Sequence, residues 1–137
     1  MVGVACRPMN ASNASPAQGP DAGILSPRVK VNESLSLGPG KIRLLRCVGE
    51  HRSISAAARA MGMPYKRAWM LLNTINEGLG HPVVETVAGG RGGGGTRLTP
   101  LGEALLERYD ALEARIREAA QAELADLLAL HEPGRRA

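Results

Sequence analysis

Two short helical patterns, separated by one glycine and one proline, constrain the fold of this chain more than any other feature. Ser53 is a plausible N-cap for "ISAAARAM", and Gly62 ends that helix after about two turns. Pro64 stands where a second helix begins, a position at which its missing N–H costs nothing. The second pattern, "PYKRAWMLLNTINEGLG", ends at Gly78 or Gly80. Two short helices joined by a tight glycine turn predict a helix-turn-helix.

The second helix has two distinct faces when its residues are placed about 100° apart. Its expected core face carries Ala68, Leu71, Leu72, Ile75 and Leu79. The opposite side carries Lys66, Met70, Asn73 and Glu77, with Arg67 and Thr74 on one flank and Tyr65 and Trp69 on the other. A basic and aromatic N-terminal end predicts a helix that enters the DNA major groove. Two alternatives stay open: an ordinary surface helix with a few basic residues, and a tryptophan that packs on a neighbouring element.

The segments on either side complete the plan of a winged helix. Residues 28–37 alternate apolar and polar side chains, which predicts one half-buried strand ended by "GPG" at 38–40. Residues 41–50 predict a short first helix. Beyond the second pattern, "PVVETV" and "TRLT" predict a hairpin with residues 88–95 at its tip. We therefore expect a mainly α fold with a small β hairpin, a winged helix-turn-helix over residues 28–99.

The hairpin tip is a glycine run in which Arg91 is the exception. The run is not a P-loop, because it lacks the lysine which that motif requires. Gly90, Gly92 and Gly95 satisfy the dinucleotide pattern G-x-G-x-x-G, but no βαβ unit of sufficient length surrounds them. A wing explains the run better, because glycines allow close approach to a sugar-phosphate wall and Arg91 can reach a phosphate or the minor groove. A loop without a partner is the alternative.

A long helical pattern follows, with Thr99 as its N-cap and Pro100 as its first residue. Apolar residues recur at spacings of three and four at Leu101, Leu105, Tyr109, Leu112 and Ile116. A continuous helix over residues 100–130 would be about 46 Å long, at about 1.5 Å per residue. So small a domain cannot cover it, so we expect it to pair with the same helix of a second copy. Residues 1–27 and 131–137 are expected to be disordered tails.

The charge is divided along the chain, whose formal net charge is +4. Residues 28–80 hold nine Lys and Arg against three Glu, whereas residues 100–137 hold five Arg against eight acidic residues. A basic middle beside an acidic end predicts a polyanionic partner for the middle. The alternative is that these charges only coat a solvated surface.

Other classes of function find little support in the sequence. Three aromatic residues are too few for a module that stacks single-stranded bases on aromatic rings. The two cysteines and three histidines show no metal-ligand spacing, and no Ser, His and acid grouping supports catalysis. The first 20 residues lack the apolar run that a signal peptide requires, and no run of about 18 apolar residues predicts a membrane span. We therefore expect neither an enzyme nor a metal site, no membrane partner, and a cytoplasmic location.

"SISAAARAMGMPYKRAW" and "VVETVAGGRGGGGTRLTPLGEALLERYDAL" resemble the N-terminal DNA-binding domain of the ModE-type, molybdate-responsive transcription regulators. More distantly, they are similar to the LysR-type winged helix-turn-helix. The most specific parts are "YK.AW" at 65–69, the glycine tip, and Leu98, Thr99 and Gly102. The resemblance implies a homodimer on a palindromic operator in double-stranded DNA, with a role in molybdate uptake or molybdoenzyme expression. Such regulators usually carry molybdate-binding lobes after this helix, so we expect no molybdate site and no cofactor in this chain.

From these patterns we expect DNA contacts from Ser53, Ser55, Pro64, Tyr65, Lys66, Arg67, Trp69, Met70, Asn73 and Arg91. Asn73 is the best candidate to read adenine, because an amide pairs with the N6 and N7 atoms of that base. Ser53 and Ser55 can donate to phosphate at a helix N-terminus. The alternative function is a dimerisation or protein-interaction module whose acidic last helix binds a separate effector-sensing protein.

Overall fold

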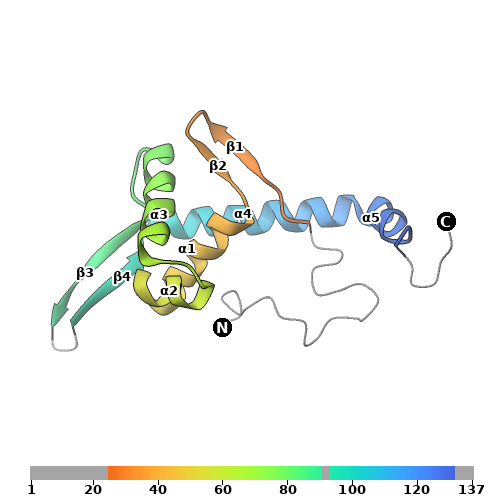
Figure 1. Ribbon diagram of the computed structural model, residues 1–137. Coiled ribbons are helices and arrows are strands. Elements are labelled where there is room, and N and C mark those ends of the chain that lie inside the picture. Colours follow the sequence, from red (N-terminus) through yellow and green to blue (C-terminus); the bar gives the residue numbers. More distant parts are fainter. Residues whose placement is uncertain (1–24, 91–92, 132–137) are drawn as a thin grey trace.

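The computed structural model describes residues 25–90 and 93–131 of the 137-residue chain. The element order is β1 (Val29–Asn32), β2 (Leu35–Leu37), α1 (Pro39–His51), α2 (Ile54–Met61), α3 (Tyr65–Leu79), β3 (Val84–Gly90), β4 (Gly93–Leu98), α4 (Pro100–Ala119) and α5 (Gln121–Leu128). Helices α1 to α3 form a compact group, from which the β3–β4 hairpin projects to one side and α4 to the other (Figure 1). This arrangement confirms the mainly α winged helix-turn-helix. Arg91 and most of the two expected tails lie outside the described residues.

The core lies between α1, α2, α3, β2 and the first half of α4. Its largest fully buried side chains are Leu35, Leu44, Leu45, Cys47, Val48, Leu72, Ile75 and Val83. From α3 the core takes Ala68, Leu72 and Ile75, while Leu71 and Leu79 are half-buried against it. The predicted apolar stripe therefore faces inward as expected, which fixes the opposite side of α3 toward solvent.

Capping and glycine geometry set the helix-turn-helix. The Ser53 hydroxyl accepts a hydrogen bond from the Ala56 N–H at 2.9 Å, which confirms the predicted N-cap of α2. Gly62 ends α2 at a φ of 69°, a left-handed conformation that glycine adopts without strain. Pro64 is the N-cap residue of α3, and Gly80, at a φ of 81°, ends that helix. Gly78 is still within the helix, so the later of the two predicted ends is the observed one.

The single strand predicted over residues 28–37 is instead the β1–β2 hairpin. The Asn32 carboxamide oxygen accepts from the N–H groups of Ser34 and Leu35, both at 3.0 Å, and this turn reverses the chain. Leu35 is buried, whereas Val31 is 41% exposed, so the two strands do not share one buried face. The Asn32 Nδ2 group also donates to the Gly78 carbonyl at 2.8 Å, which joins this hairpin to the end of α3.

The wing, defined as the β3–β4 hairpin, is longer than the sequence predicts. Strand pairing runs from Val84 opposite Leu98 to Gly90 opposite Gly93, so most of the expected glycine tip belongs to the strands. Its base is fixed by side-chain hydrogen bonds: Val83 N–H donates to Asn76 Oδ1, and Thr99 Oγ1 donates to the carbonyl of Pro82, each at 2.8 Å. The wing is therefore held firmly where it leaves the domain.

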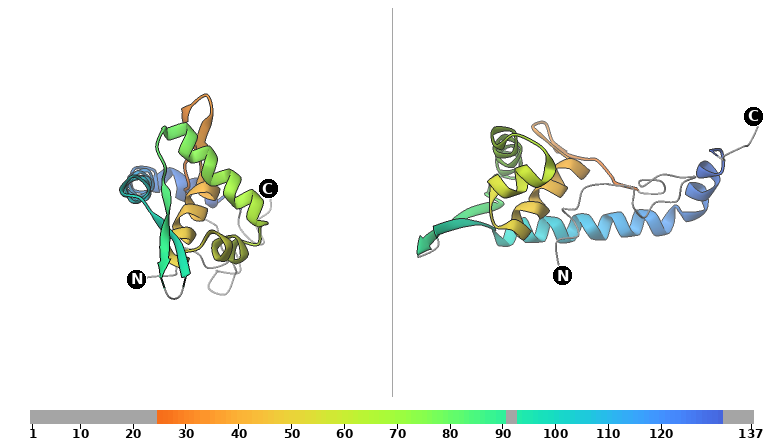
Figure 2. Two further views of the ribbon diagram at one scale, coloured as in Figure 1. Left: turned by 90° about the vertical axis from the view of Figure 1, so that its left-hand side faces the viewer. Right: turned by 60° about the horizontal axis from the view of Figure 1, so that its bottom comes forward.

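The helix expected to run continuously over residues 100–130 is broken at Ala120. Its φ of −106° and ψ of 15° end the 20-residue α4 and precede the eight-residue α5. Figure 2, right, shows α5 turned away from the axis of α4. The predicted start is confirmed, since Thr99 Oγ1 accepts from the Gly102 N–H at 3.1 Å. Within the described ranges, none of the helices is both long and apolar enough to cross a membrane.

Residues 25–27, which were expected in the N-terminal tail, run against α4. The Tyr109 hydroxyl donates to the Pro27 carbonyl at 2.6 Å, and the Ser26 hydroxyl donates to Glu113 at 3.2 Å. Leu25, Ser26 and Pro27 are each half-buried. The buried Tyr109 hydroxyl requires an acceptor, and the Pro27 carbonyl supplies it, so residues 25–27 are held against α4 instead of belonging to a disordered tail.

Candidate nucleic-acid interface

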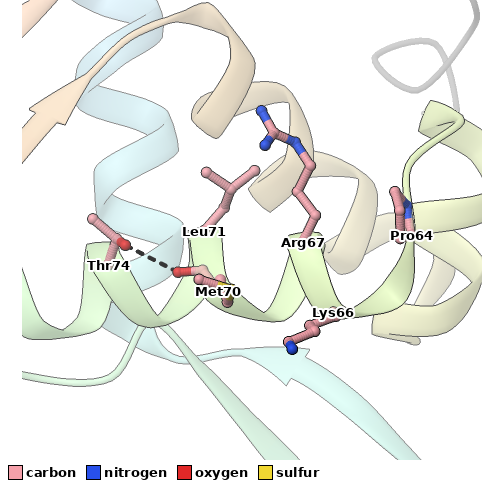
Figure 3. A pocket seen from close by; sticks show the side chains of 6 residues that line it. All are labelled: Pro64, Lys66, Arg67, Met70, Leu71 and Thr74. Atoms are coloured by element: carbon pink, nitrogen blue, oxygen red, sulfur yellow. Dashed lines mark hydrogen bonds between the residues drawn. The ribbon is translucent and has the colours of Figure 1, made fainter.

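The outward side of α3 is an exposed surface of basic and aromatic side chains. Lys66 and Arg67 are exposed, and so are Tyr65, Trp69 and Met70 at 55%, 49% and 54%. In Figure 3 the Lys66 and Arg67 side chains leave the helix on opposite sides. The two cations therefore flank a strip of helix surface. With this strip in a major groove, the two side chains could contact the phosphates of the two strands that border the groove.

A shallow groove of about 370 Å³ runs along this strip. Its lining residues are Pro64, Lys66, Arg67, Met70, Leu71 and Thr74. Met70 supplies apolar surface between the two cations, and such surface suits a thymine methyl group, whereas Leu71 leaves the helix on the same side as Arg67 (Figure 3). The Thr74 hydroxyl donates to the Met70 carbonyl at 3.0 Å, so its own proton is already used within the helix.

Asn73 is placed less favourably than its chemistry indicates. It is half-buried, and its Nδ2 group donates to Glu77 Oε2 at 3.1 Å, one helical turn away. To pair with adenine, the amide would have to exchange this intrahelical bond for the base. A carboxylate next to it also disfavours close approach of a phosphate.

The two serines at the start of α2 differ in their surroundings. The Ser53 oxygen caps the helix and its residue is half-buried, whereas Ser55 is exposed in the first turn. The structure therefore gives Ser53 a capping role and leaves Ser55 the more accessible donor for an anion at this helix N-terminus.

The two cations of α3 have no carboxylate counterion among the described residues. In residues 25–90 and 93–131, the ion pairs are Lys30–Glu33, Arg46–Asp110 and Arg97–Glu85, at 3.9, 2.7 and 2.8 Å. Lys66 and Arg67 take part in none of them. The same residues contain no group of three His, Cys, Asp or Glu side chains arranged to hold a metal ion.

Sequence reasoning missed a second basic groove, at the base of the wing. This groove, of about 270 Å³, is lined by Arg52, Val87, Gly94, Gly95, Thr96 and Arg97. Arg52 comes directly before the Ser53 N-cap, a position that could have indicated a cation beside a helix N-terminus. Its closeness to β4, which follows much later in the chain, has no signal in the sequence.

The residues expected at a dimer interface divide into two groups along α4. Leu101 and Leu105 pack against the core, and Tyr109 is only 5% exposed. Tyr109 is thus packed inside the protomer rather than presented to a partner. Farther along the helix, Leu112 is 39% exposed and Ile116 is half-buried. These two residues are the part of the stripe that remains accessible.

Comparison with known families agrees with this geometry. Residues 40–103 match the family model of the bacterial regulatory helix-turn-helix proteins of the lysR family. This part of the chain therefore resembles a LysR-type helix-turn-helix domain. That region extends from the first turn of α1 through α2, α3 and the wing to the first turn of α4, so it contains the whole candidate interface.

Proteins similar to this chain include one named for binding molybdenum-pterin and one named as a transcriptional regulator. The molybdenum-pterin-binding protein MopB of Rhodobacter capsulatus is 45% identical over 80 residues, which are 58% of this chain and 30% of that protein. The DNA-binding transcriptional dual regulator ModE of Escherichia coli K12 is 39% identical over 98 residues, 72% of this chain and 37% of that protein. The resemblance to the N-terminal region of ModE-type regulators is confirmed. The chain spans about a third of the length of these relatives.

Proposed function

We propose that this chain is a ModE-like transcription regulator that binds double-stranded DNA, with α3 as the helix that enters the major groove. The observation that carries the proposal is the pair of exposed cations, Lys66 and Arg67, with no carboxylate partner in the described residues. The opposite face of α3 is locked into the core by Ala68, Leu72 and Ile75. The helix therefore presents this pair in a fixed orientation.

The proposed complex is a homodimer on an operator with two-fold symmetry. Leu112 and Ile116 on α4 would lie at the contact between the two copies, because Leu101, Leu105 and Tyr109 of the same stripe already belong to or pack against the protomer's own core. Each α3 would then occupy one half-site, and the spacing of the half-sites would follow from the distance between the two helices. Most of the affinity would come from phosphate contacts, and it would fall steeply with added salt.

The finer part of the proposal is the gene set under control. Relatives named ModE and MopB favour genes for molybdenum uptake or for molybdoenzymes. The proposal assigns no molybdate site to the described residues, so a response to molybdate would depend on a separate effector-sensing protein or on other parts of the protein.

A protein-interaction role is the second candidate, and one observation favours it. Leu127 and Leu130, at the end of the acidic part of the chain, are 62% and 72% exposed. Exposed leucines among carboxylates suit an apolar partner surface with a basic rim. This role is compatible with DNA binding by α3.

Capture of genomic DNA tests the proposal. The purified chain is mixed with sheared genomic duplex in the presence of competitor DNA, with and without molybdate, and the bound fragments are sequenced. We expect enrichment of fragments that share a palindromic sequence. Enriched fragments that lie beside genes for molybdenum uptake or molybdoenzymes would support the finer part of the proposal, and enrichment only of fragments from other regions would count against it. Molybdate should leave the set that the purified chain captures unchanged, because the proposal assigns no molybdate site to its described residues. No enrichment over competitor would contradict DNA recognition itself.

A further inference from the structure

We infer that the groove at the base of the wing is a second phosphate-binding site, in which Arg52 binds the duplex backbone. The inference rests on the proposed function and names a contact that the α3 face does not provide. It is carried by the backbone position of Arg52, by the absence of an ion pair to its side chain among the described residues, and by the position of the groove.

The backbone of Arg52 is fixed from two sides. Arg52 ends α1 in the left-handed conformation, at a φ of 58°, and its N–H donates to the Val48 carbonyl at 2.8 Å. Its carbonyl accepts from the Thr96 N–H of β4 at 3.1 Å. Few non-glycine residues adopt positive φ, so this arginine is held at some conformational cost. Such a cost is compatible with a role for this particular side chain.

A glycine in the wing allows β4 to lie close to the Arg52 backbone. A Cβ atom on Gly95 would lie 2.8 Å from the Arg52 carbonyl oxygen, closer than real Cβ contacts allow. Glycine at this position lets β4 approach the end of α1. The approach brings Arg52 and Arg97 to the same groove, together with Thr96 and Val87.

The charge in the groove is positive and is carried mainly by Arg52. Arg97 Nε donates to Glu85 Oε2 at 2.8 Å, so the Glu85 carboxylate offsets much of its charge. Arg52 is exposed and forms no ion pair within the described part of the chain. Its planar guanidinium matches two phosphate oxygens better than a single ammonium group does.

The groove lies beside the proposed DNA face. In Figure 2, left, α2, α3 and the wing are all seen from the same side of the molecule. Arg52 is the residue before the Ser53 N-cap of α2, and Ser55 is exposed in the first turn of that helix. A duplex with α3 in its major groove would bring a sugar-phosphate strand toward the wing. This position favours backbone phosphate over a free anion as the ligand.

The salt dependence of DNA binding tests the inference. Arg52→Asn removes the charge and keeps a residue type that tolerates positive φ. The affinity of the full chain for a captured duplex and for a random duplex is measured from about 50 mM to about 200 mM salt. We expect both affinities to fall about tenfold at low salt, because the variant cannot form a charge-assisted hydrogen bond at a site that does not read sequence. The slope of log K against log salt should become shallower by about 0.9 for each phosphate that the variant no longer neutralises.

Two further variants separate binding from a structural role. Arg52→Lys keeps the charge, so most of the salt slope should return even if the affinity does not. Arg117→Ala removes one exposed positive charge from the far end of α4 and should change neither quantity. The melting temperature of Arg52→Asn should stay near that of the parent chain.

The outcomes distinguish this inference from the proposed function. A parent chain that binds duplex, together with an Arg52→Asn variant of equal affinity and equal salt slope, would overturn the phosphate site alone. A shallower slope for Arg117→Ala as well would show a general charge effect and would also overturn it. A parent chain that binds no duplex would overturn both.

Discussion

Helix α3 and the distal part of α4 each expose a helix surface, and the two surfaces have opposite chemistry. On α3, Lys66 and Arg67 lie beside exposed aromatic and sulfur-containing side chains and have no carboxylate partner in the described residues. On α4, Leu112 is exposed in a segment rich in Glu. The first surface suits a polyanion and the second suits another apolar surface. DNA binding and self-association should therefore respond to different substitutions.

The largest effect should come from removing both cations of α3. In Lys66→Ala/Arg67→Ala, we expect the affinity for duplex DNA to fall by about a hundredfold, because two charge-assisted hydrogen bonds to phosphate are removed. The melting temperature should change little, since both side chains are exposed. Fluorescence anisotropy of a labelled duplex measures the affinity.

The matched control for this double variant is Arg115→Ala/Arg117→Ala, which removes two exposed charges from α4. It should retain most of the parent affinity. Equal losses in the two double variants would mean that net charge, and not the α3 surface, governs binding.

The next effect concerns the α4 surface. Leu112→Glu places a charge on the accessible stripe, and we expect the dissociation constant of self-association to rise by at least about tenfold. Sedimentation equilibrium measures this constant. Ala114→Glu adds the same charge at an exposed position on another side of α4 and should leave it unchanged. Dimers that survive Leu112→Glu intact would exclude this stripe as the interface.

A substitution at the base of the wing should affect folding and neither surface directly. A Cβ on Gly102 would collide with the Val83 carbonyl oxygen, so Gly102→Ala should reduce the free energy of unfolding by about 2 kcal/mol. Gly40 in α1 has no atom within 4 Å of such a Cβ, so Gly40→Ala should change stability by less than about 1 kcal/mol. Urea denaturation compares the two, and equal stabilities would refute the close approach.

The smallest expected effect is a pH dependence of the free energy of unfolding, caused by ionisation of the Tyr109 hydroxyl. Burial, with a smaller contribution from Glu113, raises the pKa of this hydroxyl above its ordinary value of 10.0, although Arg28 opposes the shift. Below pH 10.0 the hydroxyl is protonated in both states and its stabilising contribution is complete. Above that pH the unfolded chain ionises first, so stability should fall as pH rises through the folded-state pKa.

Tyr109→Phe checks this assignment by urea denaturation between about pH 8 and about pH 11. The variant should lose about 1 kcal/mol at neutral pH, because the Pro27 carbonyl loses its donor. Its stability should then depend less on alkaline pH than that of the parent. An unchanged alkaline profile would assign the pH dependence to other groups.

The comparison of the two surfaces also shows what sequence patterns can predict. The caps at Ser53 and Thr99 and the inward face of α3 follow from local rules, because each depends on residues three or four positions apart. The β1–β2 turn was missed although the sequence marks it: Glu33 falls on the face of the predicted strand that carries Val31 and Leu35, and Asn32 is a residue type that favours turns. The break at Ala120 was missed because neither glycine nor proline marks it, and alanine favours helix.

Contacts between residues far apart in the sequence explain the remaining differences between the predictions from sequence and the observed structure. Arg52 lines the groove because β4 returns to the end of α1, and the Tyr109 hydroxyl has its hydrogen-bond partner because residues 25–27 run along α4. Neither contact has a signature within a short window of sequence. The α3 residues were predictable as a surface, while the wing-base groove became apparent only in the folded chain.

The central claim, that the α3 surface contacts the duplex, is tested most directly by the emission of Trp69. This residue is the only tryptophan of the chain, lies on α3, and is 49% exposed. Duplex DNA is titrated into the protein while binding is followed independently by anisotropy of the labelled DNA. We predict that Trp69 emission changes in step with binding and becomes protected from a soluble quencher. Saturated binding with unchanged emission and unchanged quenching would contradict the claim.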